Sequence, residues 1–140
     1  MSFDTQAFIE YFNKKDHFSI KNGIRLIALE KGYAKATMHV SENSFNYMGS
    51  VHGGVLYTLA DVAAGTAVVP YGSTCVTLDV SMNYLRPALH GSITAVARQV
   101  RRGSKISVLE VHIYDEHEKL LCQAMYTMYM TGKPVDISNP

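Results

Sequence analysis

The sequence is poor in cysteine and has almost no net charge. Its two cysteines, Cys75 and Cys122, form no CxxC pair, and no ordered Cys and His spacing surrounds them. A zinc site is therefore not indicated, and we expect two reduced core cysteines. Thirteen lysines and arginines face twelve aspartates and glutamates, for a net charge of +1. No basic field exists to attract nucleic acid or an acidic membrane, so we expect neither as a partner.

Repeats, low-complexity linkers and long apolar runs are also missing. Residues 1–16 include acidic residues and no unbroken apolar stretch, which is not the pattern of a signal peptide. The most apolar window, residues 51–69, is interrupted by Asp61, which disfavours a membrane span. With 47% apolar and 18% charged residues over 140 positions, the chain has the composition and size of one globular domain. We expect a single cytoplasmic domain over residues 1–140.

The hydrophobic periodicity predicts an α+β fold. Apolar residues at helical spacing after Asp4 indicate a short N-terminal helix. Residues 54–69 are apolar on nearly every face, which predicts a helix buried on all sides and ended by Pro70 and Gly72. Residues 76–82 alternate between apolar and polar, as in a half-exposed strand. Strands are also expected near residues 24–29, 33–40, 92–101, 105–115 and 120–130, with a hairpin turn at Lys31-Gly32.

This element set consists of one buried helix and about six mostly antiparallel strands. A helix that is apolar all round needs more cover than one sheet face supplies. We therefore expect the strands to curl around the helix and the remaining apolar surface to meet a second copy. Homo-oligomerisation is thus a prediction from the sequence, with dimer and tetramer both open.

Asp61 is the only acidic or basic side chain between residues 53 and 69. Burying an unpaired carboxylate is costly, so a residue in this position usually has a partner or a chemical task. A structural hydrogen bond to a neighbouring loop and a catalytic role both fit this position.

His52, Gly53 and Gly54 stand at the predicted helix start, where the first turn has unpaired N–H groups. Two residues without side chains let a ligand oxygen approach this backbone, as an oxyanion or a polarised carbonyl requires. Gly54 and Asp61 lie roughly 10 Å apart along one helix. One carbonyl could hardly reach both, so a shared site would take its carboxylate from the dyad-related helix of a partner.

The run from Asn46 to Asp61 resembles the signature of hotdog-fold acyl-CoA thioesterases of the phenylacetate-pathway (PaaI-like) type. In that pattern Asn stands six positions before an HGG and Asp nine positions after the His, as Asn46, His52 and Asp61 do here. The element order and the run 83–87, Asn-Tyr-Leu-Arg-Pro, match as well. The resemblance implies a hotdog fold, in which a curled sheet wraps a central helix.

The resemblance also implies roles for single residues. Asp61 would be the catalytic carboxylate, acting as general base on water or as nucleophile on the thioester. The Gly54 N–H would polarise the thioester carbonyl, while His52 and Asn46 would shape the site. Thr77 falls where relatives carry Ser or Thr near the attacking water. We expect His52, beside the positive end of a helix, to stay neutral; a capping histidine fits equally well.

Coenzyme A carries phosphates, and the turn that contains Arg101, Arg102, Gly103 and Lys105 is the most basic cluster available to hold them. Charged hairpin turns are often only solvated, and here Ser104 stands where related sequences often have a basic residue. We expect the acyl pocket along the helix and the preceding loop, lined by Gly53, Tyr47, Met48 and Tyr57. Aromatic and Met residues at such spacing also fit a plain core.

Taken together, these features predict an acyl-CoA thioesterase that releases a free acid and coenzyme A. No metal or redox cofactor is expected, because coenzyme A is part of the substrate. Two alternatives remain: a hotdog hydratase or dehydratase, and a non-catalytic acyl-CoA binding module. The acyl group, the oligomeric state and the choice between base and nucleophile for Asp61 are left open.

Overall fold

A computed structural model describes residues 2–138 of the chain. The helical elements are α1 (Thr5–Lys15), α2 (His17–Lys21) and α3 (Gly53–Ala67), with short 3-10 helices η1 (Glu42–Ser44) and η2 (Val69–Tyr71). The strands are β1 (Ile24–Glu30), β2 (Tyr33–His39), β3 (Ser73–Tyr84), β4 (Ser92–Arg102), β5 (Ile106–Tyr114) and β6 (Leu120–Pro134). The predicted α+β architecture is confirmed, and most predicted boundaries lie within a few residues of those in the structure.

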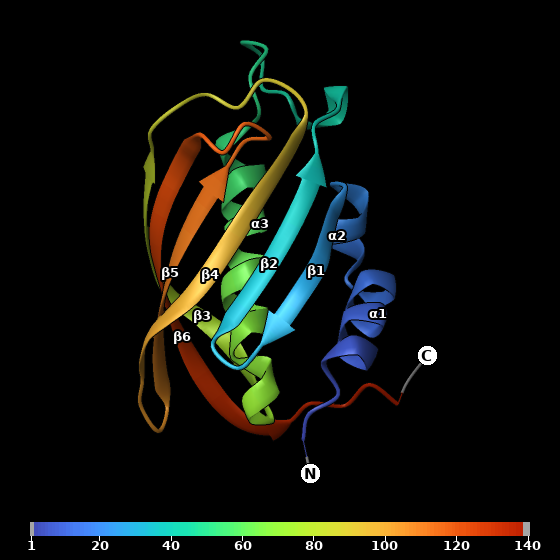
Figure 1. The fold of residues 1–140 in the computed structure, drawn as a ribbon, viewed down its shortest axis with the longest axis vertical. Helices are drawn as coiled ribbons and strands as arrows, with labels where there is room; N and C mark the ends of the chain where they lie inside the picture. Colours follow the sequence, from blue (N-terminus) through green and yellow to red (C-terminus); the bar gives the residue numbers. More distant parts are fainter. Residues whose placement is uncertain (1, 139–140) are drawn as a thin grey trace.

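The six strands form one antiparallel sheet in the order β1-β2-β4-β5-β6-β3. The sheet curls around α3, and α1 and α2 lie beside β1 at one side (Figure 1). The turn at Lys31-Gly32 joins β1 to β2 as predicted; Gly32 adopts a φ of 76°, which suits glycine. The core lies between α3 and the inner sheet face, where Leu59 and Tyr126 have no exposed surface.

The N-terminal helix begins as its sequence indicates, with the Asp4 side chain accepting a 2.9 Å hydrogen bond from the Ala7 N–H. Its only fully buried side chain is Phe8. A second helix, α2, follows after Asp16 and was not predicted. It is only five residues long, so it carries too little periodicity to be recognised from the sequence.

The helical stretch Gly53–Tyr71, which includes α3 and η2, is by length and composition apolar enough to cross a membrane, but 67% of its most apolar window is buried inside the protein. The prediction of burial on all sides is wrong in one respect. Gly54 and Tyr57 are exposed, and Asp61 and Gly65 are only half-buried. These residues recur every three or four positions, so they form one stripe along α3 that this protomer leaves uncovered.

Strand β3 is an edge of the sheet and is mostly exposed. The expectation that its apolar residues share one half-buried face is wrong, because the pairing with β6 shifts register between Thr77 and Asp79. This bulge inserts one extra residue and switches the faces. Thr77 consequently points toward α3, while Val76 and Leu78 are 52% and 57% exposed.

Candidate active site

Asp61 lies in the uncovered stripe of α3, opposite the edge strand. The Thr77 hydroxyl donates a 2.6 Å hydrogen bond to Asp61 Oδ1. Burial raises the pKa of the Asp61 carboxyl; the Thr77 bond acts in the opposite direction, and the charge of Asp16 adds to the rise. The site therefore holds a carboxylate that is more basic than one in water and is oriented by a neighbouring hydroxyl.

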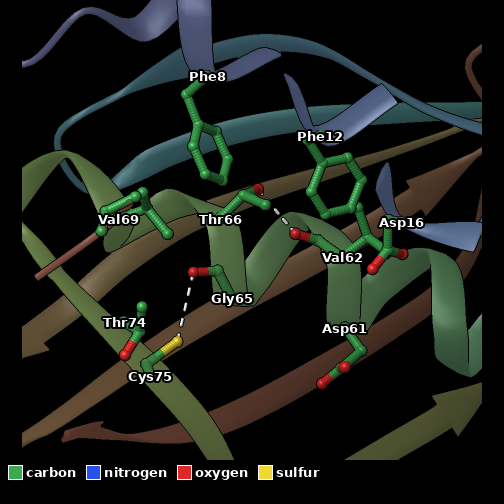
Figure 2. A pocket seen from close by; sticks show the side chains of 11 residues that line it. Phe8, Phe12, Asp16, Asp61, Val62, Gly65, Thr66, Val69, Thr74 and Cys75 are labelled. Carbon is green, nitrogen blue, oxygen red and sulfur yellow. Dashed lines mark hydrogen bonds between the residues drawn. The ribbon is translucent and has the colours of Figure 1, made fainter. Parts of the chain in front are cut away.

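A pocket of about 290 Å³ opens beside this carboxylate. Its apolar wall comes from three parts of the fold: Phe8 and Phe12 on α1, Val62 on α3, and Val135 after β6. In Figure 2 the two phenylalanines stand over α3, and Asp61 projects from the same helix below them. The N-terminal helix thus forms one wall of a space that Asp61 also lines.

The start of α3 has a different arrangement. The His52 side chain caps the helix, and its Nδ1 accepts a 2.9 Å hydrogen bond from the Gly54 N–H. A ring nitrogen that accepts carries no proton, so this bond requires the neutral ring. In this protomer the Gly54 N–H is thus already engaged, and it must share its hydrogen or release His52 before it can polarise a substrate carbonyl.

The neighbouring glycine is explained by packing. The Tyr84 hydroxyl donates a 2.9 Å hydrogen bond to the Gly53 carbonyl oxygen. A Cβ atom at Gly53 would lie 3.3 Å from Tyr84 Cε1, tighter than nearly all real contacts of this kind. Tyr84 therefore holds the first turn of α3 in place, a role that the sequence did not reveal because it depends on the strand running past the helix end.

The two halves of the predicted site face different hollows in one protomer. His52 and Gly54 line a hollow of about 260 Å³ together with Phe18 and Phe45, whereas Asp61 lines the pocket under α1. Along the helix axis, Gly54 and Asp61 are roughly 10 Å apart. A single protomer therefore does not bring them onto one carbonyl.

Asn46 braces its own loop. Its Oδ1 accepts hydrogen bonds from the Met48 N–H at 2.9 Å and the Ser50 N–H at 3.2 Å, and its Nδ2 donates to Ser50 Oγ at 3.2 Å. Tyr47 and Met48, at the loop tip, are 95% and 70% exposed, and neither lines the pocket beside Asp61. Within one protomer the structure does not place these three residues with the carboxylate.

The basic hairpin contains a hollow of about 310 Å³. Arg102, Gly103 and Lys105 line it with Tyr71 and other residues, and Arg101 does not. The Arg102 guanidinium lies 3.8 Å from the centre of the Tyr71 ring, a cation–π contact that holds the side chain in place. Two of the three predicted cations thus share one concave surface.

Several pocket residues were missed by sequence reasoning, among them Phe8, Phe12, Asp16 and Val135. The two phenylalanines were assigned to a helix but only as part of its apolar face. Asp16 stands between two helices and carries no motif. Among residues 2–138, no group of three His, Cys, Asp or Glu side chains is arranged to hold a metal ion.

Comparison with known proteins decides the family. The model described as "Thioesterase superfamily" matches residues 48–122. The chain belongs to the thioesterase superfamily. A relative within it, the 1,4-dihydroxy-2-naphthoyl-CoA hydrolase of Listeria monocytogenes, is 32% identical over 114 residues, which are 79% of this chain and 93% of that protein.

Solved structures place this thioesterase-superfamily chain among PaaI-like hotdog folds, as its sequence signature predicts. The Escherichia coli PaaI structure superposes with a TM-score of 0.87 at 26% identity and covers 94% of this chain and 97% of that one. The E. coli acyl-coenzyme A thioesterase PaaI is 33% identical over 98 residues, or 69% of this chain and 70% of its own length.

A hypothetical thioesterase protein of Streptococcus pneumoniae, solved with coenzyme A, has a TM-score of 0.76 at 32% identity, over 80% of this chain and 91% of that one. Two further structures of that protein carry alanine in place of an aspartate and of a threonine. Those two residues are separated by the same number of positions as Asp61 and Thr77. In this chain the pair is joined by a hydrogen bond.

Proposed function

We propose that this member of the superfamily is an acyl-CoA thioesterase that hydrolyses its substrate to the free acid and coenzyme A. The observation that carries the proposal is the half-buried Asp61 carboxylate, oriented by Thr77 at the mouth of a largely apolar pocket. A carboxylate in apolar surroundings is a stronger base than one in water, and a positioned base contributes on the order of 100- to 10,000-fold.

Two routes balance the reaction. As general base, Asp61 takes a proton from water while the hydroxide attacks the thioester carbonyl; the thiolate of coenzyme A leaves and recovers a proton. As nucleophile, the carboxylate attacks the carbonyl and expels the thiolate, and water then hydrolyses the resulting mixed anhydride. Thr77 supports either route, because its hydroxyl fixes one carboxylate oxygen and leaves the other for the reaction.

We infer that the active unit is at least a dimer. Edge strand β3 offers unpaired backbone groups and the exposed side chains Val76 and Leu78, which suits pairing with the same strand of a second copy. That pairing would cover the open stripe of α3 and bring the Gly54 N–H of one protomer toward the Asp61 of the other. The separation of the two groups within one protomer supports this assignment.

The hairpin hollow is assigned to the phosphates of coenzyme A. Arg102 and Lys105 supply the cations, and guanidinium groups bind phosphate oxygens with charge-assisted hydrogen bonds. Ser104 carries no charge, which leaves Lys105 as the cation after the turn.

Release of free thiol from short, medium, long and aryl acyl-CoA esters tests the proposal. Turnover of at least one ester, lost in Asp61→Asn, is the expected result. If every ester is bound but none is hydrolysed, the chain is an acyl-CoA binding module. Addition of water to an enoyl-CoA without thiol release would instead identify a hydratase.

A further inference from the structure

The pocket beside Asp61 contains a second carboxylate. Asp16, at the junction of α1 and α2, lines the same space from the side opposite α3 (Figure 2). Among the described residues that line this pocket there is no lysine, arginine or histidine. The space is therefore apolar in most of its wall and negative at two points.

Hydrogen-bond donors in the wall are already committed. The Thr66 hydroxyl donates to the Val62 carbonyl oxygen at 2.7 Å, and the Cys75 thiol donates to the Gly65 carbonyl oxygen at 3.4 Å. The Thr74 hydroxyl forms a 2.6 Å hydrogen bond with the Thr131 hydroxyl. An anion that entered this pocket would lose its water without gaining a cation or a free donor, which is costly.

Only one carboxylate oxygen of Asp16 accepts a hydrogen bond from the described residues. The Ser19 hydroxyl donates to Oδ2, and no hydrogen bond is given to Oδ1 by the described residues. Its charge reaches across the pocket: burial, opposed by the Thr77 hydrogen bond, is the main cause of the raised pKa of Asp61, and Asp16 raises that pKa further. The charge of Asp16 therefore acts on a second group that lines the same pocket.

The acyl group is the part of the substrate that fits this space. Asp61 must reach the thioester carbonyl, and the pocket leads away from Asp61 between apolar side chains of α1 and α3. The coenzyme A portion carries phosphates, which two carboxylates would repel, and the cationic hollow of the β4–β5 hairpin lies elsewhere. This step rests on the proposed thioesterase function.

We infer that the enzyme is selective for uncharged acyl groups, and that Asp16 is the specificity-determining residue that excludes acyl groups ending in a carboxylate. Specificity arises here through repulsion of the wrong substrate rather than attraction of the right one. Like charges that share a pocket repel each other, so we expect even a partly solvated Asp16 to give a discrimination of at least about tenfold.

The test compares hexanoyl-CoA with adipoyl-CoA, which have equal chain length and differ by a terminal carboxylate. We expect wild-type kcat/KM to favour hexanoyl-CoA, and Asp16→Asn to reduce that preference by at least about tenfold. Asparagine still accepts from Ser19, and Asp16→Ser provides a second neutral residue suited to the start of α2. Glu10→Gln, which removes an exposed charge from α1, is the matched control and should leave the ratio within about twofold of wild type.

Two results overturn the inference separately from the function. If Asp16→Asn and Asp16→Ser melt like the wild type and hydrolyse both esters with the wild-type ratio, Asp16 is only a structural cap. If Glu10→Gln changes the ratio as much as Asp16→Asn, the selectivity reflects overall charge. If the wild type hydrolyses no ester at all, the proposed function fails and this inference fails with it.

Discussion

Thr77 and Asp61 join the edge strand β3 to helix α3 through a 2.6 Å hydrogen bond. Thr77 reaches the carboxylate because the register shift after it turns its side chain toward the helix. The bond ties the proposed catalytic group to the sheet edge at which we expect a second protomer to pair. We therefore expect catalysis, protonation and assembly to be linked at this one contact.

Replacing Asp61 by Asn should lower turnover by at least about a hundredfold, because a positioned base or nucleophile is lost. Thiol release under saturating substrate measures this. The oligomer should persist, which sedimentation checks. Turnover near that of the wild type would remove Asp61 from the mechanism.

The same variant should be more stable than the wild type. Because the pKa of Asp61 is raised in the folded state by burial, the folded protein binds this proton more tightly than the unfolded chain. Its contribution to stability is therefore present at low pH and is lost as pH rises through the raised pKa. At neutral pH asparagine avoids that cost, and we expect Tm to rise by a few degrees. A lower Tm for Asp61→Asn at neutral pH would contradict this account.

Replacing Thr77 by Val should move the acid limb of the kcat/KM profile to higher pH. The Thr77 hydrogen bond lowers the pKa of Asp61, so its loss raises that pKa and keeps the base protonated over a wider acid range. We expect a shift of up to about one pH unit. Thr127→Val, on the neighbouring strand β6 and away from the carboxylate, is the control; an equal shift there would point to a general effect on the fold.

Replacing Gly54 by Pro tests the role of the N–H group. Proline lacks this donor but is tolerated in the first helical turn, and the preceding Gly53 has no Cβ to clash with the ring. Loss of one oxyanion donor costs about 100- to 1,000-fold in turnover. His52→Ala keeps the Gly54 N–H and removes its partner. It should lower the stability by about 1 kcal/mol, and it should reduce activity less than Gly54→Pro does. Full activity in Gly54→Pro would exclude polarisation by this group.

Replacing Leu78 by Lys should prevent pairing at β3. A lysine on an exposed sheet edge opposes edge-to-edge association, and the isolated protomer would lack half of its site. Sedimentation should show monomer, and activity should fall and recover as protein concentration rises. Val100→Lys, the control, introduces the same charge at a residue of β4 that is 60% exposed. A Leu78→Lys protein that is monomeric but fully active would show that one protomer suffices.

The sequence was most informative where local pattern and burial agree. The long apolar helix with one acidic residue, the hairpin at Gly32 and the alternating strands were all predicted, because period and turn chemistry are local properties. The resemblance added candidate site residues. Their spatial grouping was only partly foreseeable: Asp61 and Thr77 are in contact, whereas Asn46 braces its own loop.

What could not be predicted depends on contacts between distant parts of the chain. The sequence left a capping role for His52 open beside a catalytic one, and the structure shows the cap. The packing of Tyr84 on Gly53, by contrast, needs the end of one strand to pass the start of α3. Likewise Asp16 carries no motif; it becomes part of a pocket only because α1 folds against α3. Side-chain alternation also failed at Leu78, since nothing local in the sequence marks a bulge.

The bulge in β3 divides the strand into two parts with different surroundings. On its N-terminal side, Cys75 lines the pocket and Thr77 contacts Asp61; on its C-terminal side, Val80 and Met82 pack against the core. Substitutions at one end of β3 can therefore change the side chains around Asp61 while the apolar packing at the other end stays the same. Changes in this site need not destabilise the fold.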